Sequence, residues 1–207
     1  MKNLFATSLL ILILGINTAS AQTSPCGEWK TSKENGNYKV YVRECADSPI
    51  KEFKILDLFH GNFDTLVKVM NDVNTTKRIS RNCTEARMLK DLGNHESIQY
   101  YYFNLPLTLA DRDVITKCRI LQTATAYRIE SETYSESVVS VAYKKDVIRL
   151  KSVKTFYYFE KMPNGMIRME YIGRADPNGW IPAWLVNMMA QTEAQKMVER
   201  LKSLVQK

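Results

Sequence analysis

The residues of this chain with the widest chemical repertoire are its four cysteines, Cys26, Cys45, Cys83 and Cys118. Thiols bind zinc, attack electrophiles or pair as disulfides, but these spacings match no zinc pattern. An even number of cysteines is typical of disulfide pairing in an exported protein, and four allow three pairings. Cys26 precedes a short segment that we interpret as helical, and Cys45 ends the strand after it, so the two can meet where the chain doubles back. This order favours a Cys26–Cys45 disulfide, with free buried thiols as the alternative.

The other reactive residue types form no catalytic or cofactor-binding constellation in the sequence. His60 precedes a predicted helix and His95 lies in a turn between predicted strands. Neither histidine has a nucleophile or a carboxylate at a spacing typical of a catalytic site, so we expect both on the surface. Serine occurs without the Gly-x-Ser-x-Gly context of a nucleophile elbow, and no Gly-rich phosphate loop or metal-ligand cluster is present. The sequence therefore predicts no catalytic residue, no cofactor and no metal.

The first 21 residues have the features of a signal peptide. Lys2 supplies the positive region, Leu9 to Leu14 is an apolar run too short to span a bilayer, and Ala19-Ser20-Ala21 has the small-x-small form that signal peptidase reads. Thr23-Ser24-Pro25 before Cys26 does not fit a lipoprotein box. We expect cleavage before Gln22 and export to the periplasm or the extracellular space, with an uncleaved anchor helix as the alternative.

The mature chain is expected to form one domain over residues 22–207. No Gly/Ser/Pro-rich linker, internal repeat or low-complexity tract divides it, and its length supports a substantial core. The formal charge of +7 falls by one when Lys2 leaves with the leader. The excess positive charge is spread over the chain rather than gathered in a stripe, which argues against a nucleic-acid partner. We expect a monomer, with possible transient contact to anionic membrane surfaces.

Strands dominate the middle of the chain, and helices flank them. The elements before the main strands are a hairpin with strands at 38–43 and 50–58, a helix capped by Asn62, and a short helix or turn at 75–80. Alternating patterns predict further strands at 84–89, 97–104, 113–121, 125–134, 147–160 and 166–174. Asn164-Gly165 fits the tip of the last hairpin, because such turns need positive φ angles.

A long amphipathic helix ends the chain. Pro182 sits where the first turn of a helix tolerates proline. One apolar stripe follows, which contains Asn187, Ala190, Ala194, Met197, Val198, Leu201, Leu204 and Val205. This face must be buried. A run of strands between helices is an α+β order, and we expect a bent antiparallel sheet that grips the last helix.

Two segments together resemble a known family. Leu105-Pro106-Leu107-Thr108-Leu109-Ala110-Asp111-Arg112-Asp113-Val114 is similar to the proline-containing loop and the Arg-Asp strand start of START domains, the StAR-related lipid-transfer modules. Asp176-Pro177-Asn178-Gly179-Trp180-Ile181-Pro182 is similar to the start of that family's last helix. With Glu28-Trp29-Lys30 and Val40-Tyr41-Val42-Arg43 at the front, the resemblance covers nearly the whole mature chain.

The resemblance implies a helix-grip fold with an internal hydrophobic tunnel for one lipid or sterol-like molecule. The loop at 105–111 and the start of the last helix would form a gate, with Leu107, Leu109, Arg112, Trp180 and Trp184 as its candidate residues. For each the alternative is structural: the leucines pack as core, Arg112 and Asp113 fix the loop to the sheet, and the tryptophans lock the helix start. We favour the structural interpretation for Arg112-Asp113.

One departure from the family bears on the ligand. Several animal members that bind sterols or phospholipids carry an inward basic residue six positions after the Arg of Arg-Asp, paired with an acidic residue on the preceding strand. Cys118 stands at the first position here, and Gln99 stands at about the second. Losing both partners together is physically consistent, because one buried charge left alone is costly. We therefore expect a neutral, weakly polar cavity and do not carry over the sterol or phosphatidylcholine specificity.

Strand parity predicts which side chains line the tunnel. If Cys118 points inward, Thr116 and Val114 do so too, whereas Lys117 and Arg119 point outward. The matching set on the strand before is Gln99, Tyr101 and Phe103, and the last helix would contribute Ala190, Ala194, Met197 and Leu201. Each of these residues has plain core packing as its alternative.

We therefore expect non-catalytic binding of a lipid or another hydrophobic small molecule, with or without its transfer. The alternative is a helix-grip enzyme, such as a polyketide cyclase or aromatase, that acts on a hydrophobic substrate, because a fold does not exclude catalysis. A third class is an exported interaction domain with a filled core. Catalysis needs convergent reactive groups, whereas binding needs only a suitable cavity.

Overall fold

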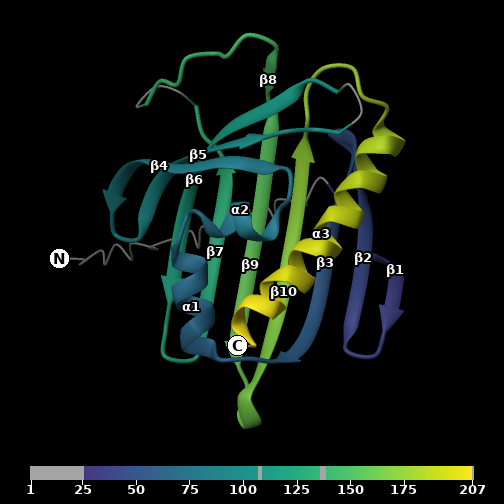
Figure 1. Ribbon diagram of the computed structural model, residues 1–207. Coiled ribbons are helices and arrows are strands. Elements are labelled where there is room, and N and C mark those ends of the chain that lie inside the picture. The colour runs from purple at the N-terminus through teal and green to yellow at the C-terminus, as the bar shows by residue number, and fades with distance from the viewer. Residues whose placement is uncertain (1–25, 107–108, 136–138, 207) are drawn as a thin grey trace, which may run out of the picture.

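The computed structural model describes residues 26–106, 109–135 and 139–206. A single sheet of ten strands is combined with three α-helices and one 3-10 turn (Figure 1). The strands are β1 (Lys30–Asn35), β2 (Tyr38–Cys45), β3 (Ser48–His60), β4 (Cys83–Gly93), β5 (Glu96–Phe103), β6 (Asp111–Gln122), β7 (Ala126–Thr133), β8 (Val147–Arg149), β9 (Ser152–Lys161) and β10 (Met166–Asp176). The helices are α1 (Phe63–Asn71), α2 (Thr75–Ile79) and α3 (Ala183–Val205).

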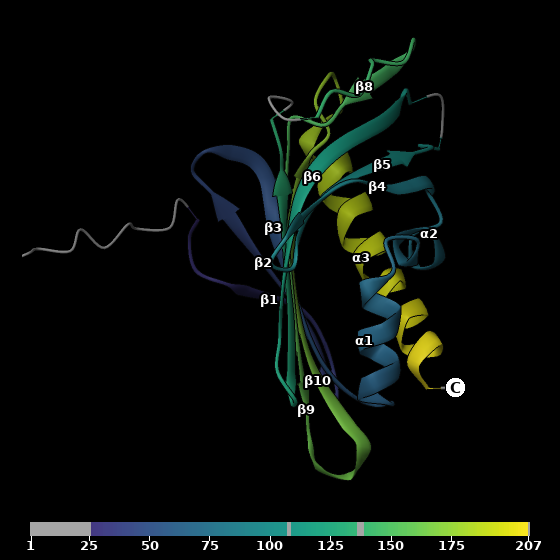
Figure 2. The ribbon, with the colours of Figure 1, turned by 90° about the vertical axis from the view of Figure 1, so that its left-hand side faces the viewer.

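The sheet has the strand order β1-β2-β3-β10-β9-β7-β6-β5-β4, and all these neighbours pair antiparallel. Only β8 lies off this path, where it pairs parallel with β6. All three helices lie on one side of the sheet, and the strands β4, β5 and β6 curve over toward them (Figure 2). The predicted α+β fold, a curved antiparallel sheet around a C-terminal helix, is confirmed.

Helix α3 runs diagonally across the inner face of the sheet (Figure 1). Its residues Ala194, Val198, Leu201 and Val205 are buried in the main core. Polar contacts hold the helix at several points along its length. Asn187 Oδ1 accepts from the Lys51 backbone N–H at 2.9 Å, and the Lys202 ammonium lies 2.7 Å from a carboxylate oxygen of the buried Asp57. Asn187 therefore bridges α3 to β3, although the periodicity had placed it on the apolar stripe.

Two predicted elements differ from the observed ones. The segment after Cys26 is the strand β1, not a helix, and its six residues are all exposed, so no apolar alternation marks it in the sequence. The predicted strand at 147–160 is two strands. The backbone N–H of Leu150 donates to the backbone carbonyl of Asp113, and that of Lys151 donates to the backbone carbonyl of Asp176. At these residues the chain passes from β8, which pairs with β6, to β9, which lies between β7 and β10.

The 162–166 connection and the end of β10 match the sequence analysis. Asn164 and Gly165 have φ angles of 61° and 69° at the hairpin tip, as the turn chemistry predicts. Strand β10 ends at Asp176, and α3 begins at Ala183 with Pro182 as the residue before its first turn.

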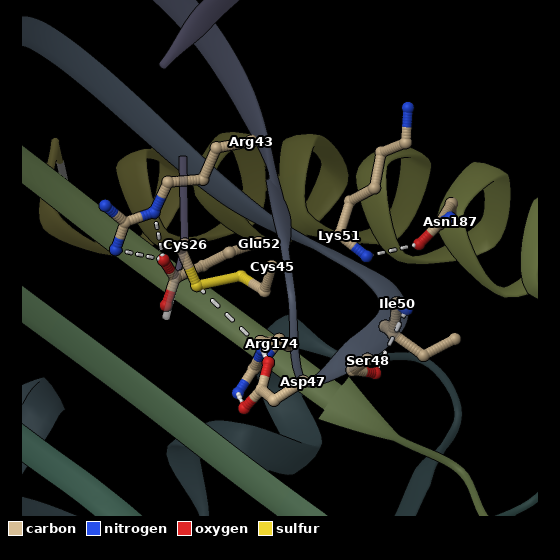
Figure 3. Close-up of a disulfide and its surroundings, with 10 residues drawn as sticks. All are labelled: Cys26, Arg43, Cys45, Asp47, Ser48, Ile50, Lys51, Glu52, Arg174 and Asn187. Carbon is tan, nitrogen blue, oxygen red and sulfur yellow. Dashed lines mark hydrogen bonds and ion pairs between the residues drawn. A yellow bond between two sulfur atoms is a disulfide. The ribbon is translucent and has the colours of Figure 1, made fainter. Parts of the chain in front are cut away.

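The predicted Cys26–Cys45 disulfide is present, whereas Cys83 and Cys118 are free and buried. Figure 3 shows the disulfide among charged side chains of β2, β3 and β10. Arg43 Nε lies 2.5 Å from Glu52 Oε2, and the Arg174 guanidinium binds both carboxylate oxygens of Asp47 at 2.7 and 3.0 Å. Although Cys26, Cys45 and Glu52 bring three donor atoms within 4.8 Å, the disulfide consumes both thiols and Arg43 engages the carboxylate.

Within the described residues, no helix combines the length and the apolar character that crossing a membrane requires. The predicted signal peptide, residues 1–21, lies outside the described residues.

Candidate functional site

An internal cavity of about 290 Å³ lies between the inner face of the sheet and the helices. Its walls come from β5, β6, β7, β9 and β10, from the segment that carries α1 and α2, and from one residue of α3. They are Met70, Asn71, Asp72, Val73, Thr75, Thr76, Ile79, Ser80, Gln99, Tyr101, Phe103, Val114, Thr116, Cys118, Ile120, Ile129, Ser131, Leu150, Val153, Thr155, Tyr157, Tyr171, Ala175 and Met197. This volume is at the lower end of the range found for small-molecule sites.

The structure brings together all six strand residues that parity predicted to face inward. Gln99, Tyr101 and Phe103 of β5 and Val114, Thr116 and Cys118 of β6 line the cavity. Lys117 and Arg119 lie on the opposite face, where both make ion pairs with Glu96. Contact of the six residues with a ligand stays a prediction.

The predicted roof residues of α3 divide between two places. Met197 lines the cavity, whereas Ala190 and Ala194 line a separate void of about 70 Å³ that also touches Phe53 and Gly173. Leu201 is 1% exposed and packs in the core. Tyr171, Thr155 and Ala175 line both the cavity and the smaller void, so the tyrosine ring stands at their boundary.

The sequence analysis missed a large part of the lining. The segment that carries α1 and α2 supplies eight lining residues, Met70 to Val73, Thr75, Thr76, Ile79 and Ser80. Their contribution depends on where this segment docks, which local patterns do not reveal. Val153, Thr155 and Tyr157 of β9 carried a usable signal, because they alternate along one strand with outward neighbours such as the exposed Lys154.

The cavity lining carries many hydroxyl groups but almost no charge. Among the described lining residues Asp72 is the one that carries a charge, and it is exposed at the end of α1. Burial raises the pKa of Tyr171 to about 12 and that of Tyr157 well above its ordinary value. Burial likewise raises the pKa of the Cys118 thiol, against a smaller opposite effect of its hydrogen bond with Ser131. These groups are therefore uncharged at neutral pH.

Gln99 and Cys118 both face the cavity. They occupy the two positions at which several animal START domains carry a buried ion pair. Gln99 is directly opposite Thr116 in the β5–β6 register, and Cys118 is opposite Ser97. Gln99 Nε2 donates to Ser97 Oγ at 2.9 Å, and its Oε1 accepts from the hydroxyl of Tyr101. At Gln99, where some members of the family carry one partner of an ion pair, this chain therefore forms hydrogen bonds between neutral groups.

Arg112 connects the two segments of the predicted gate. Its side chain is 3% exposed and donates to the backbone carbonyls of Ala110, Pro177 (2.8 Å) and Asn178 (3.2 Å). Phe103 and Ala175, which line the cavity, stand just before these segments in the chain. Arg112 therefore fixes the backbone at one end of the cavity, which agrees with the structural interpretation of this residue.

Asp113 has a different partner. Its carboxylate, almost fully buried, accepts from Arg149 Nε at 3.0 Å and Nη2 at 2.8 Å, and from the Tyr100 hydroxyl at 3.1 Å. This ion pair secures β8 beside β6, next to a second small core of Ile98, Tyr100, Ile115 and Val141. Arg112 and Asp113 thus hold different parts of the structure, and a role of Arg112 in a gate stays a prediction.

The remaining gate candidates differ in exposure. Leu107 lies outside the described residues, and Leu109 is half-buried. Trp180 is 90% exposed and Trp184 is 68% exposed, and Met188 lies one turn further along α3 at 53%. Neither tryptophan is buried against the helix start, which favours the entrance interpretation, and their place in a gate stays a prediction.

The chain matches the START domain family over residues 18–207. This protein belongs to the START domain family. START domain-containing protein 10 of human and mouse is 28% identical over 165 residues, which cover 79% of this chain and 52% of the relative. The chain thus spans about half the length of these curated relatives. The uncharacterized protein PA1579 of Pseudomonas aeruginosa is 22% identical over 180 residues, 87% of this chain and 88% of that protein.

Solved START structures share the fold of this START domain. Human STARD10 superposes with a TM-score of 0.75 at 23% identity over 85% of this chain and 72% of that one. The STAR-related lipid transfer protein from Xanthomonas axonopodis gives 0.72 at 23% identity over 84% of this chain and 97% of that one. At these identities the likeness establishes the fold alone.

A second hollow of about 360 Å³ lies on the outer face of this START domain's sheet. Its walls include the charged residues Glu52, Lys117, Arg119, Glu130, Glu132 and Lys154. Charges of both signs line it, and burying them under an apolar ligand would cost several kcal/mol each. His60 and His95 are exposed, as predicted. The internal cavity is therefore the candidate site.

Proposed function

We propose that this START domain binds one uncharged hydrophobic molecule in its internal cavity and performs no chemistry on it. The observation that carries the proposal is a cavity of about 290 Å³ in which Asp72, an exposed residue, is the one charged member of the lining over the part of the chain that the structure describes. An apolar ligand in such a site gains roughly 25 cal/mol for each Å² of apolar surface removed from water. The described lining offers no nucleophile activated by an adjacent base.

The relatives support this proposal in general terms. The Xanthomonas axonopodis protein with the same fold is called a lipid transfer protein. We extend lipid binding to this chain because the fold forms a cavity of suitable character, and we leave the family's charged ligand contacts out because Gln99 and Cys118 stand at those positions.

We further propose that loading and release occur at a membrane surface. Trp180, Trp184 and Met188 expose apolar surface at the start of α3, beside the segments that Arg112 holds together. Amphipathic tryptophan rings suit the membrane interface, and the net positive charge of the chain favours anionic lipids.

We propose that the protein works as a monomer after export. The leader-like residues 1–21 support export. The Cys26–Cys45 disulfide adds support, because such bonds persist in oxidising compartments.

A hydrocarbon probe tests the binding function. Diphenylhexatriene fluoresces in apolar surroundings and carries no polar group. Mature protein should bind it, and Val153→Trp should abolish binding because Val153 lines the cavity. Lys154→Trp is the matched control, since the neighbouring side chain is exposed and points to the other face. Equal binding by both variants would refute the cavity as the site, and turnover of a supplied lipid ester or polyketide would establish the enzyme alternative.

A vesicle experiment tests the membrane role separately. Cosedimentation with vesicles of phosphatidylethanolamine and phosphatidylglycerol should fall in a Trp180→Ala/Trp184→Ala variant while diphenylhexatriene binding persists. Trp29→Ala is the control, because Trp29 is covered by the cations of Arg43 and Lys54. A loss of the same size in the control would contradict the proposed contact surface.

A further inference from the structure

Gln99 and Thr116 form a polar pair at the wall of the cavity. They are directly opposite each other in the antiparallel register of β5 and β6, and both line the cavity. Side chains of opposed residues on one face of a sheet lie about 5 Å apart at Cβ. One ligand atom can therefore contact both side chains.

Thr116 lacks a hydrogen bond that its burial demands. The residue is 3% exposed, and its Oγ1 has no hydrogen-bond partner among the described residues. A buried hydroxyl without a partner is destabilising, because it has lost its hydrogen bonds to water and gained none in return. Since the side chain belongs to the cavity wall, a group inside the cavity is positioned to satisfy it.

Gln99 is oriented by its neighbours and retains one donor. The Tyr101 hydroxyl donates to Gln99 Oε1, and Gln99 Nε2 donates to Ser97 Oγ at 2.9 Å. A primary amide carries two N–H groups, so one remains after the bond to Ser97.

The same wall disfavours an anion. The described lining contains no lysine, arginine or histidine, so a carboxylate or phosphate would be buried without a counter-charge. Burying an unpaired charge costs far more than burying a hydroxyl that forms hydrogen bonds. The polar end of a fatty acid or a phospholipid is therefore a poor fit beside Gln99 and Thr116.

We propose that the ligand is a neutral lipid with a single hydroxyl or carbonyl oxygen, which accepts hydrogen bonds from the Thr116 hydroxyl and from the remaining Gln99 N–H. This inference rests on the proposed binding function and names the class of its ligand: long-chain alcohols or ketones rather than fatty acids or phospholipids. The hydrocarbon part occupies the rest of the cavity, toward Tyr157 and Met197.

Competition against bound diphenylhexatriene tests the inference with 1-dodecanol, dodecane and dodecanoate. Dodecanol should compete best. In Thr116→Val, which keeps the shape of the side chain, dodecanol should lose about fivefold in affinity, because the hydrogen bond from the cavity hydroxyl is then absent. Dodecane should be unaffected. Thr116→Ser should retain the preference for the alcohol.

Thr155→Val is the matched control, because Thr155 also lines the cavity but lies on β9, two strands away from β6. It should leave the preference for dodecanol intact. Equal competition by dodecanol and dodecane in the wild type, better competition by dodecanoate, or an unchanged preference in Thr116→Val would each overturn the inference while the binding function stands. If diphenylhexatriene itself fails to bind, the binding function falls and the inference falls with it.

Discussion

Replacing Gly173 by alanine tests whether Tyr171 stands as a packed divider between the cavity and the smaller void. A Cβ at Gly173 would lie 2.7 Å from Tyr171 Cζ and 3.3 Å from Cε1, and closer still to the hydroxyl oxygen. Carbon atoms prefer separations of about 3.5–4.0 Å, so the ring must move by about 1 Å or more. Tyr157 stands on another side of it, with ring centroids 4.7 Å apart.

The expected cost is about 2 kcal/mol, in the range for an overpacked core. For a domain of this size that lowers Tm by about 4–8 °C. The sign is informative, because alanine in place of glycine at an unstrained position stabilises a protein by about 0.4–1 kcal/mol through the unfolded chain. We would therefore assign a loss of stability to the contact with Tyr171, which supplies the three atoms nearest to the added Cβ.

Thermal and urea unfolding followed by circular dichroism measure the effect. Gly27→Ala is the matched control, since the nearest atom to its added Cβ is Glu44 O at an ordinary 3.7 Å, and it should stay within about 0.5 kcal/mol of the wild type. In a Tyr171→Leu background the cost of Gly173→Ala should shrink by about 1 kcal/mol or more. Equal Tm values for Gly173→Ala and Gly27→Ala would refute the reasoning.

Three further predictions concern the disulfide, the pH dependence and the gate. Cys26→Ser/Cys45→Ser should cost about 3 kcal/mol in unfolding free energy, because the bond closes a loop with a sequence separation of 19, and a reductant should destabilise the wild type but not this variant. The unfolding free energy should fall as the pH rises from about 9 toward 12, since burial raises the pKa of Cys83 from 9.0 to about 12 and that of Tyr171 from 10.0 to about 12, so the unfolded chain loses these protons first. In Cys83→Ala/Cys118→Ala the fall should begin near pH 10, the ordinary tyrosine value, and an unchanged onset near 9 would contradict the assignment. Arg112→Lys should speed amide hydrogen exchange in the segments around Ala110 and Asn178 but not in β3. The reason is that a lysine ammonium cannot replace the planar guanidinium that donates to three backbone carbonyls. An equal increase of exchange throughout the protein would contradict a local role of Arg112.

The sequence predicted the walls of the cavity better than its roof. Strand alternation is local and has a period of two, so one inward residue, Cys118, determined the side of Thr116 and Val114. The apolar stripe of α3 showed which face is buried but not what covers it. Ala190 and Ala194 therefore face a small void rather than the main cavity, and Leu201 packs as core.

The elements that the sequence analysis missed lack a local signature. β1 has no apolar residue, so neither alternation nor helical periodicity identifies it. β8 is separated from β9 because the backbone of Leu150 and Lys151 bonds to Asp113 and Asp176, far away in the chain. The Thr116 hydroxyl without a hydrogen-bond partner could not be predicted from the sequence either, because only the packed structure shows which polar atoms lack partners.

The position of β1 in the sheet affects whether the protein aggregates at high concentration. It forms one open border of the sheet, and an open border invites strand addition and aggregation. All six of its residues are exposed, two of them lysines, and charged borders discourage such pairing. Ser32 and Lys33 are also hydrogen-bonded to Gln191 and Gln195 of α3, while the disulfide holds the chain just before the strand. The disulfide and the two hydrogen bonds to α3 therefore hold this border in place, and its two lysines oppose the addition of a strand from a second molecule.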